Sequence, residues 1–118
     1  MEISWYPAES RVSETAAALK TEGAQVRDRL GFEPLSTIGV IAAGAVLVRA
    51  LMRLYKDARY KGVIIDITRK PVEVREMSGW PRQQVLLVSA EGARFVEVGD
   101  TASGLENLNQ LTKLLDKV

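Results

Sequence analysis

The chain has 118 residues, of which 47% are hydrophobic and 26% are charged, and its formal net charge is +1. This length and composition predict one globular domain with its own core, and so small a net charge does not single out nucleic acid or an acidic substrate. The chain contains no Cys and no His. Disulfides, thiol catalysis, thiolate metal sites and histidine acid–base catalysis are therefore excluded.

Two elements are predicted near the amino terminus. Residues 2–6 alternate in polarity and predict a short strand that ends at Pro7 and joins either edge of the sheet. In residues 8–30 the apolar residues recur at alternating intervals of four and three, which predicts a long amphipathic helix that ends at Gly31 or Pro34. Its apolar seam consists of Val12, Ala16, Leu19, Gly23, Val26 and Leu30. The first ten residues lack the pattern of a secretory signal, so we expect a cytoplasmic protein.

A second helix is predicted from a cap at Ser36 or Thr37 to about residue 58. It contains an unbroken run of eleven residues without a polar side chain, residues 38–48. A helix that is apolar on every side has to be covered all round by protein or by lipid. This run is shorter than the roughly 20 residues that a membrane span needs. We therefore favour a core helix or a subunit interface, and the alternative is a membrane-associated protein that inserts residues 35–55.

The second half of the chain predicts four strands and a last helix. The hydrophobic period falls to two in four segments, residues 62–68, 72–76, 85–89 and 94–98. Residues 77–83 form a loop between two hairpins, and Gly92 suits the tight turn of the second hairpin. Thr101 or Ser103 caps the last helix. Its inward residues are predicted to be Leu105, Leu108, Leu111 or Thr112, and Leu115.

These elements follow one another in the order β-α-α-β-β-β-β-α. Hairpins combined with amphipathic helices predict an α+β two-layer sandwich, with a mainly antiparallel sheet and helices on one face. No linker or repeat interrupts the chain, so residues 1–118 are expected to form a single domain. The order of the strands in the sheet is left open.

Carboxylates are the remaining acid–base candidates. Asp66 interrupts an apolar strand, and Glu73 and Glu76 lie in the strand that follows it. A carboxylate without a positioned partner is a weak catalytic signal, and it more often faces solvent or pairs with an Arg. The chain also has no Gly-rich phosphate loop and no GxSxG motif. We therefore expect no enzyme, and we predict no catalytic residue, cofactor or metal site.

A protein partner is the favoured interpretation, and it includes self-association into a homo-oligomer. An apolar helix face would be larger than the apolar patch that a soluble monomer normally exposes. An exposed Trp is a typical anchor for a partner protein, although a Trp can equally well fill the end of the core. A basic stripe beside that face is either an ordinary solvated surface or a site for phosphates, and no nucleic-acid motif accompanies it. The predicted partner-binding residues are Gly39, Ala43, Val46, Arg49, Arg53, Lys56 and Trp80.

The middle of the chain resembles a known family. A Gly/Ala-rich apolar helix that ends in a basic turn (IAAGAVLVRALMRLYKDARYK) leads directly into a strand pair (GVIIDITRKPVEVRE). Over residues 36–98 this layout is similar to that of effector-associated constant components. These small bacterial domains accompany effectors, often proteases or nucleotide-dependent switches, in predicted conflict or immunity systems. The resemblance implies a non-enzymatic adaptor in a defence system, and it transfers no site residue.

Overall fold

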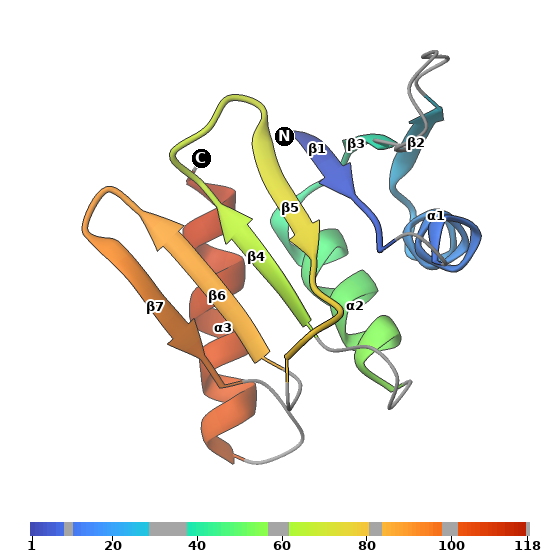
Figure 1. Cartoon of the computed structure of the whole chain (residues 1–118). Coiled ribbons are helices and arrows are strands. Elements are labelled where there is room, and N and C mark those ends of the chain that lie inside the picture. Colours follow the sequence, from blue (N-terminus) through green and yellow to red (C-terminus); the bar gives the residue numbers. More distant parts are fainter. Residues whose placement is uncertain (9–10, 29–37, 57–61, 81–83, 98–101, 118) are drawn as a thin grey trace.

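The computed structural model describes residues 1–8, 11–28, 38–56, 62–80, 84–97 and 102–117 (Figure 1). Within these ranges the chain forms seven strands and three helices, which confirms the α+β class. In chain order they are β1 (Glu2–Tyr6), α1 (Val12–Thr21), β2 (Gln25–Asp28), β3 (Ile38–Ile41), α2 (Gly44–Tyr55), β4 (Gly62–Asp66), β5 (Val72–Glu76), β6 (Gln84–Ser89), β7 (Gly92–Val96) and α3 (Ala102–Asp116).

The strands form one mixed sheet in the order β2-β3-β1-β5-β4-β6-β7. Strands β1 and β5 are parallel, β4 and β6 are parallel, and the other four neighbouring pairs are antiparallel. Strand β1 therefore lies inside the sheet, and the expectation that it joins an edge is wrong. Its position follows from pairing on both sides, with β3 and with β5.

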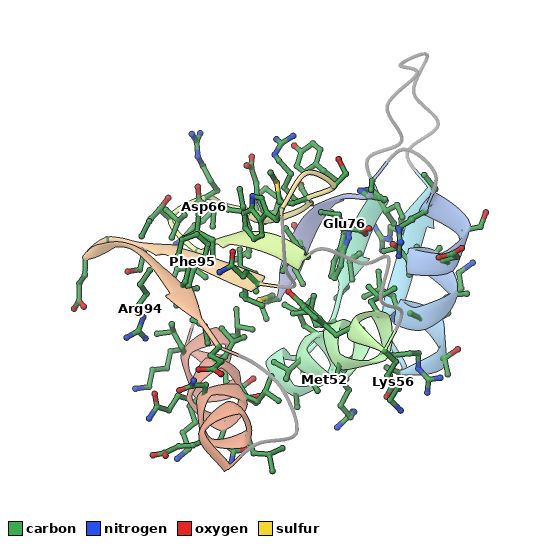
Figure 2. The ribbon with its side chains drawn as sticks, turned by 60° about the horizontal axis from the view of Figure 1, so that its bottom comes forward. Met52, Lys56, Asp66, Glu76, Arg94 and Phe95 are labelled. Atoms are coloured by element: carbon green, nitrogen blue, oxygen red, sulfur yellow. The ribbon has the colours of Figure 1, made fainter. Side chains whose placement is uncertain are left out.

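The core lies between the sheet and helices α2 and α3, which lie on the same side of the sheet in both views (Figures 1 and 2). Alternate residues of the strands face it, because successive side chains of a strand point to opposite faces. One cross-strand row of this face contains Trp5, Val74, Ile65 and Leu87, which are at most 2% exposed. Fully buried leucines of the helices pack against these rows, for example Leu19, Leu47 and Leu115.

The apolar run of residues 38–48 is not one helix, contrary to the prediction. Its first four residues form β3, and α2 begins only at Gly44. Ile38 and Val40 face the core with 1% exposure each, and β-branched residues suit a strand that pairs on both sides. No helix here is therefore formed by the whole apolar run, and none has to be surrounded by protein or lipid on every side.

Gly44 also determines how α2 packs. A Cβ at this position would lie 2.6 Å from Asp116 Oδ1 and 3.0 Å from the Cβ of Leu115. The Gly44 amide donates a hydrogen bond of 3.1 Å to the same Asp116 carboxylate. The missing side chain thus lets the start of α2 lie directly against the end of α3.

The predicted helix over residues 8–30 is also divided. Helix α1 ends at Thr21, and strand β2 begins at Gln25. Between them Gly23 adopts a φ of +97°, which favours glycine, and the Ala24 amide donates to the Leu19 carbonyl at 3.0 Å. This arrangement is a glycine helix stop. The apolar residues continue at intervals of four and three beyond Gly23, but the helix does not.

The second half of the chain follows the prediction more closely. Strands β4, β5 and β6 and helix α3 coincide with predicted elements to within two residues, and β7 begins two residues earlier than expected. Ser103 lies within the range of α3, and Leu105 is 51% exposed although it was expected to face inward. Gly31, Pro34, Ser36, Thr37 and Thr101 lie outside the described residues.

Candidate functional site

An open groove of about 600 Å³ runs between helices α2 and α3. Apolar and small polar side chains line it, and four charged residues line its edge. The apolar and small residues are Ala45, Val48, Met52, Leu105, Leu108, Asn109 and Thr112. The charged residues are Glu22, Arg49, Arg53 and Lys56. Figure 2 shows Met52 and Lys56 on the helical side of the molecule.

The floor of this groove, hereafter the α2–α3 groove, is a second apolar stripe beside the core stripe of α2. Leu47 and Leu51 point into the core, whereas Val48, which is 7% exposed, and the partly buried Met52 lie one position further round the helix and line the groove. Leu105 of α3 has about half of its surface exposed, at 51%. A leucine this exposed beside other apolar groups marks a surface that favours an apolar contact.

The edge of the groove is organised by one carboxylate. Arg53 donates from Nε and Nη2 to Glu22 Oε1 at 3.1 and 2.9 Å, and Arg49 Nε lies 3.4 Å from Glu22 Oε2. The two arginine side chains remain 51% and 59% exposed. With the exposed Lys56 the edge has three positive charges and one negative charge, which leaves a local charge of +2. The groove therefore attracts anionic groups at its rim.

The small residues that were predicted to share one helix face do not share it. Gly39 lies in β3, opposite Arg27 of β2, while Ala43 is the exposed N-cap of α2 and Val46 is partly buried against the core. The prediction that these residues share a helix face is wrong because the chain changes from strand to helix between residues 41 and 44. Of the predicted partner-binding residues, the structure brings Arg49, Arg53 and Lys56 together in the groove.

Trp80 lies elsewhere, with Phe95 of β7. The two rings form an edge-to-face pair with centroids 5.7 Å apart. Phe95 is 59% exposed and pairs in register with Leu86, on the sheet face that points away from the core row of Leu87. The sequence reasoning missed Phe95, although an aromatic residue on the polar face of a strand is a signal that could have identified it.

Glu76 has the most unusual environment among the carboxylates that the structure describes. It is 7% exposed and accepts hydrogen bonds from Trp5 Nε1 at 2.7 Å, Thr15 Oγ1 at 2.6 Å and the Ala8 amide at 3.3 Å. Burial raises the pKa of this carboxyl, and these hydrogen bonds together with the Arg11 charge counteract part of the rise. These contacts join β5 to β1, to α1 and to the segment between them, so Glu76 acts as a structural bridge.

Asp66 is also structural. Its carboxylate accepts hydrogen bonds from the amide and the hydroxyl of Thr68 and lies 3.7 Å from Arg69 Nε, which holds the turn after β4. The register places Glu73 opposite Asp66, whereas Glu76 lies opposite Val63. The three carboxylates therefore do not converge on one point.

Among the described residues, no group of three or more Asp, Glu, His or Cys side chains is placed to hold a metal ion. In the same part of the chain, each helix is too short or too polar to cross a membrane.

The comparisons with known proteins return no relative. The chain matches no family model, no curated protein and no solved structure.

Proposed function

We propose that this domain is a non-enzymatic interaction module that binds an acidic amphipathic helix of a partner protein in the α2–α3 groove. The observation that carries this proposal is the juxtaposition of the half-exposed Leu105, beside the other apolar residues of the groove, and a rim of net charge +2. Grooves between helices recognise amphipathic helices through apolar residues on one helical face, and complementary charges accelerate and orient binding.

Two features favour such a helix as the occupant. Leu105 and Met52 offer apolar surface from the two walls, and a helix with leucines at intervals of three and four residues presents a matching stripe. Arg49 and Arg53 share a single carboxylate, so each guanidinium retains donors for an acidic side chain of the partner.

The resemblance of residues 36–98 to effector-associated constant components supports a cytoplasmic effector as the partner, in a bacterial conflict or defence system. In the structure, helix α2 begins at Gly44 and is followed by the strands β4 and β5. In this proposal the domain performs no chemistry, needs no cofactor, and positions or regulates the effector that it binds.

The test uses two labelled helical peptides with the same leucine stripe, one flanked by Glu and one flanked by Lys. Fluorescence anisotropy measures their binding to the whole chain. We expect the Glu peptide to bind more tightly by at least about tenfold, and Leu105→Ala to weaken it by a similar factor. Trp80→Ala, on the opposite face of the sheet, serves as the matched control and leaves binding unchanged. Equal binding of both peptides, or no binding of either, contradicts the proposal.

Two further measurements test whether the chain associates with itself or with a membrane. Light scattering after size-exclusion chromatography detects a homo-oligomer, and Leu105→Arg then tests whether a second copy occupies the groove. Flotation with anionic liposomes detects lipid binding. A dimer that Leu105→Arg dissociates, or a chain that floats with the liposomes, would replace the partner helix with another occupant.

A further inference from the structure

Strand β7 departs from the polarity of the rest of the sheet at Arg94 and Phe95, whereas Val96 pairs with Val85 and packs against the core. The core-facing row that contains Val74, Ile65 and Leu87 continues in β7 with Arg94, whereas Phe95 points to the opposite face. A strand at the edge of a sheet over a helix is expected to place its aromatic residue inward and its arginine outward. This departure places an exposed arginine on the α3 side of β7, where the pattern of the sheet predicts an apolar side chain.

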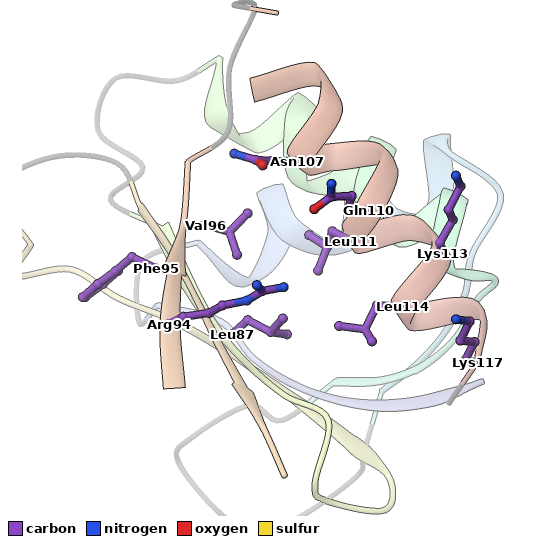
Figure 3. Close-up of a pocket in the computed structure, with 10 residues that line it drawn as sticks. All are labelled: Leu87, Arg94, Phe95, Val96, Asn107, Gln110, Leu111, Lys113, Leu114 and Lys117. Carbon is purple, nitrogen blue, oxygen red and sulfur yellow. The ribbon is translucent and has the colours of Figure 1, made fainter. Parts of the chain in front are cut away.

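Arg94 enters a hollow of about 280 Å³ between β7 and α3 (Figure 3). The hollow has an apolar part and a polar part. The apolar part is lined by Leu87, Val96, Leu111 and Leu114, and Phe95 borders it from β7 with its ring directed away from the hollow (Figure 3). The polar part is lined by Arg94, Asn107, Gln110, Lys113 and Lys117. In Figure 3 the Arg94 side chain extends from β7 toward α3, and the two lysines lie along the second half of that helix.

The charge of this hollow is uncompensated. Three cations line it, and none of the described lining residues is Asp or Glu. Within the described part of the chain, Arg94, Lys113 and Lys117 form no ion pair, in contrast to Arg49 and Arg53 with Glu22. All three residues are exposed, and an anion bound between them would be attracted by each positive charge.

The walls of the hollow are held in place. Asn107 Nδ2 donates to the Glu97 carbonyl at 2.9 Å and joins α3 to the chain just after β7. Leu87 and Leu111 form a floor that is 2% and 3% exposed, and Leu111 belongs to the central core. The volume is close to the lower end of the range of small-molecule sites, roughly 300 Å³, so it suits a small ligand.

We propose that this hollow binds a small amphipathic anion, with a carboxylate or phosphate headgroup on Arg94 and a short aliphatic part against the leucines. The planar guanidinium donates two parallel hydrogen bonds to either headgroup, and Lys113 and Lys117 add charge. The apolar floor supplies the part of the binding free energy that a simple inorganic anion cannot gain. This ligand site is separate from the α2–α3 groove and does not depend on the proposed partner helix.

The probes are four ligands with the same eight-carbon chain: octanoate, octyl phosphate, octanol and octyltrimethylammonium. Amide chemical shifts of the isotope-labelled whole chain locate the site, and titration measures the affinity. We expect octanoate or octyl phosphate to bind at least about tenfold more tightly than octanol, with shifts at β7 and α3, and octyltrimethylammonium not to bind. The comparison of octanoate with octyl phosphate distinguishes the two headgroups.

Two matched variants test the role of Arg94. Arg94→Gln removes one positive charge and is expected to reduce the affinity for the anions to that for octanol. Arg69→Gln removes the same charge from an exposed turn and leaves the affinity unchanged. Thermal unfolding monitored by circular dichroism checks that both variants fold.

Three results would overturn the proposal. Octanol that binds as tightly as the anions reduces the hollow to an apolar cavity. Failure of both anions to bind, or equal anion binding by Arg94→Gln, removes the ligand site. Dimerisation or aggregation of a non-binding Arg94→Gln variant would assign Arg94 to the protection of an edge strand, which inward-pointing charges also provide.

Discussion

Two glutamates hold helix α1 at opposite ends, and they do so in different surroundings. Glu76 is 7% exposed and accepts hydrogen bonds from the neutral donors Trp5, Thr15 and Ala8. The Glu22 side chain, 18% exposed, interacts with two arginines that are themselves more than half exposed. Burial therefore distinguishes a carboxylate that stabilises the fold from one that shapes a surface, because a buried donor without an acceptor costs more than a lost surface ion pair.

The largest expected effect is the loss of the buried carboxylate. Glu76→Ala leaves the Trp5 and Thr15 donors buried without an acceptor, and we expect the free energy of unfolding to fall by about 3 kcal/mol or more. Urea denaturation followed by fluorescence measures it. Glu73→Ala, on the same strand but opposite Asp66 on the other face, is the matched control. A loss for Glu76→Ala no larger than the loss for Glu73→Ala would contradict the structural role of Glu76.

Removing one donor of the same cluster is expected to cost less. Trp5→Phe keeps an aromatic ring in the core but loses the Nε1–H group and some volume, so we expect a loss of about 2 kcal/mol. Trp80→Phe in the loop is expected to change stability by less than about 0.5 kcal/mol. The same urea measurement compares the two tryptophans, and equal effects would be inconsistent with the buried position of Trp5.

The pH dependence of stability separates the two glutamates in a different way. Because burial raises the pKa of Glu76 in the folded state, the folded chain binds this proton more tightly than the unfolded chain. The resulting stabilisation is fully present below the pKa of this carboxyl in the unfolded chain. It is lost as pH rises through the raised pKa of the folded chain. We therefore expect the Glu76 contribution to the free energy of unfolding to decrease as pH rises between these two pKa values.

Glu76→Gln removes that part of the slope, whereas Glu22→Gln retains it because Glu76 is still present. Denaturant midpoints measured at several pH values from acidic to neutral test the difference. Identical slopes for the original chain and Glu76→Gln would show that the Glu76 proton does not contribute.

The smallest expected effect on stability is at Glu22. Glu22→Gln breaks exposed ion pairs with Arg49 and Arg53, and we expect a loss of less than about 1 kcal/mol. The same change releases two guanidinium groups in the α2–α3 groove, so the Glu-flanked peptide is expected to bind a few-fold more tightly. Glu14→Gln, also on α1 but away from the groove, controls for net charge. Weaker peptide binding by Glu22→Gln than by Glu14→Gln would contradict the role of the freed arginines.

The second half of the fold was predictable because its signals are local. Val72 and Val74 alternate with charged residues, Gly92 provides the turn between β6 and β7, and Leu108, Leu111 and Leu115 recur at helical spacing. Each signal determines an element without reference to distant residues. Leu105 follows the same spacing and is still exposed, because the start of α3 borders the groove instead of the sheet.

The first half was less predictable because two strands there are decided by distant pairing. Val26 fits the spacing of the preceding helix, and Val40 fits the spacing of the helix that follows it. Both lie in strands that pair with each other, and Val40 also pairs with Ile3 of β1. The candidate groove was only partly predictable for the same reason: the basic spacing of α2 was visible, but its apposition to Leu105 was not.

The sequence by itself determined the α+β class, the alternation of the later strands, the last helix, and the absence of cysteine and histidine chemistry. These properties depend on residue identity and on spacing over a few positions. Only the tertiary structure decided that residues 38–41 form a strand, that Glu76 is buried, and that Arg94 borders the hollow between β7 and α3. The physical reason is that hydrogen-bond partners and burial come from segments far away along the chain, and local spacing does not contain that information.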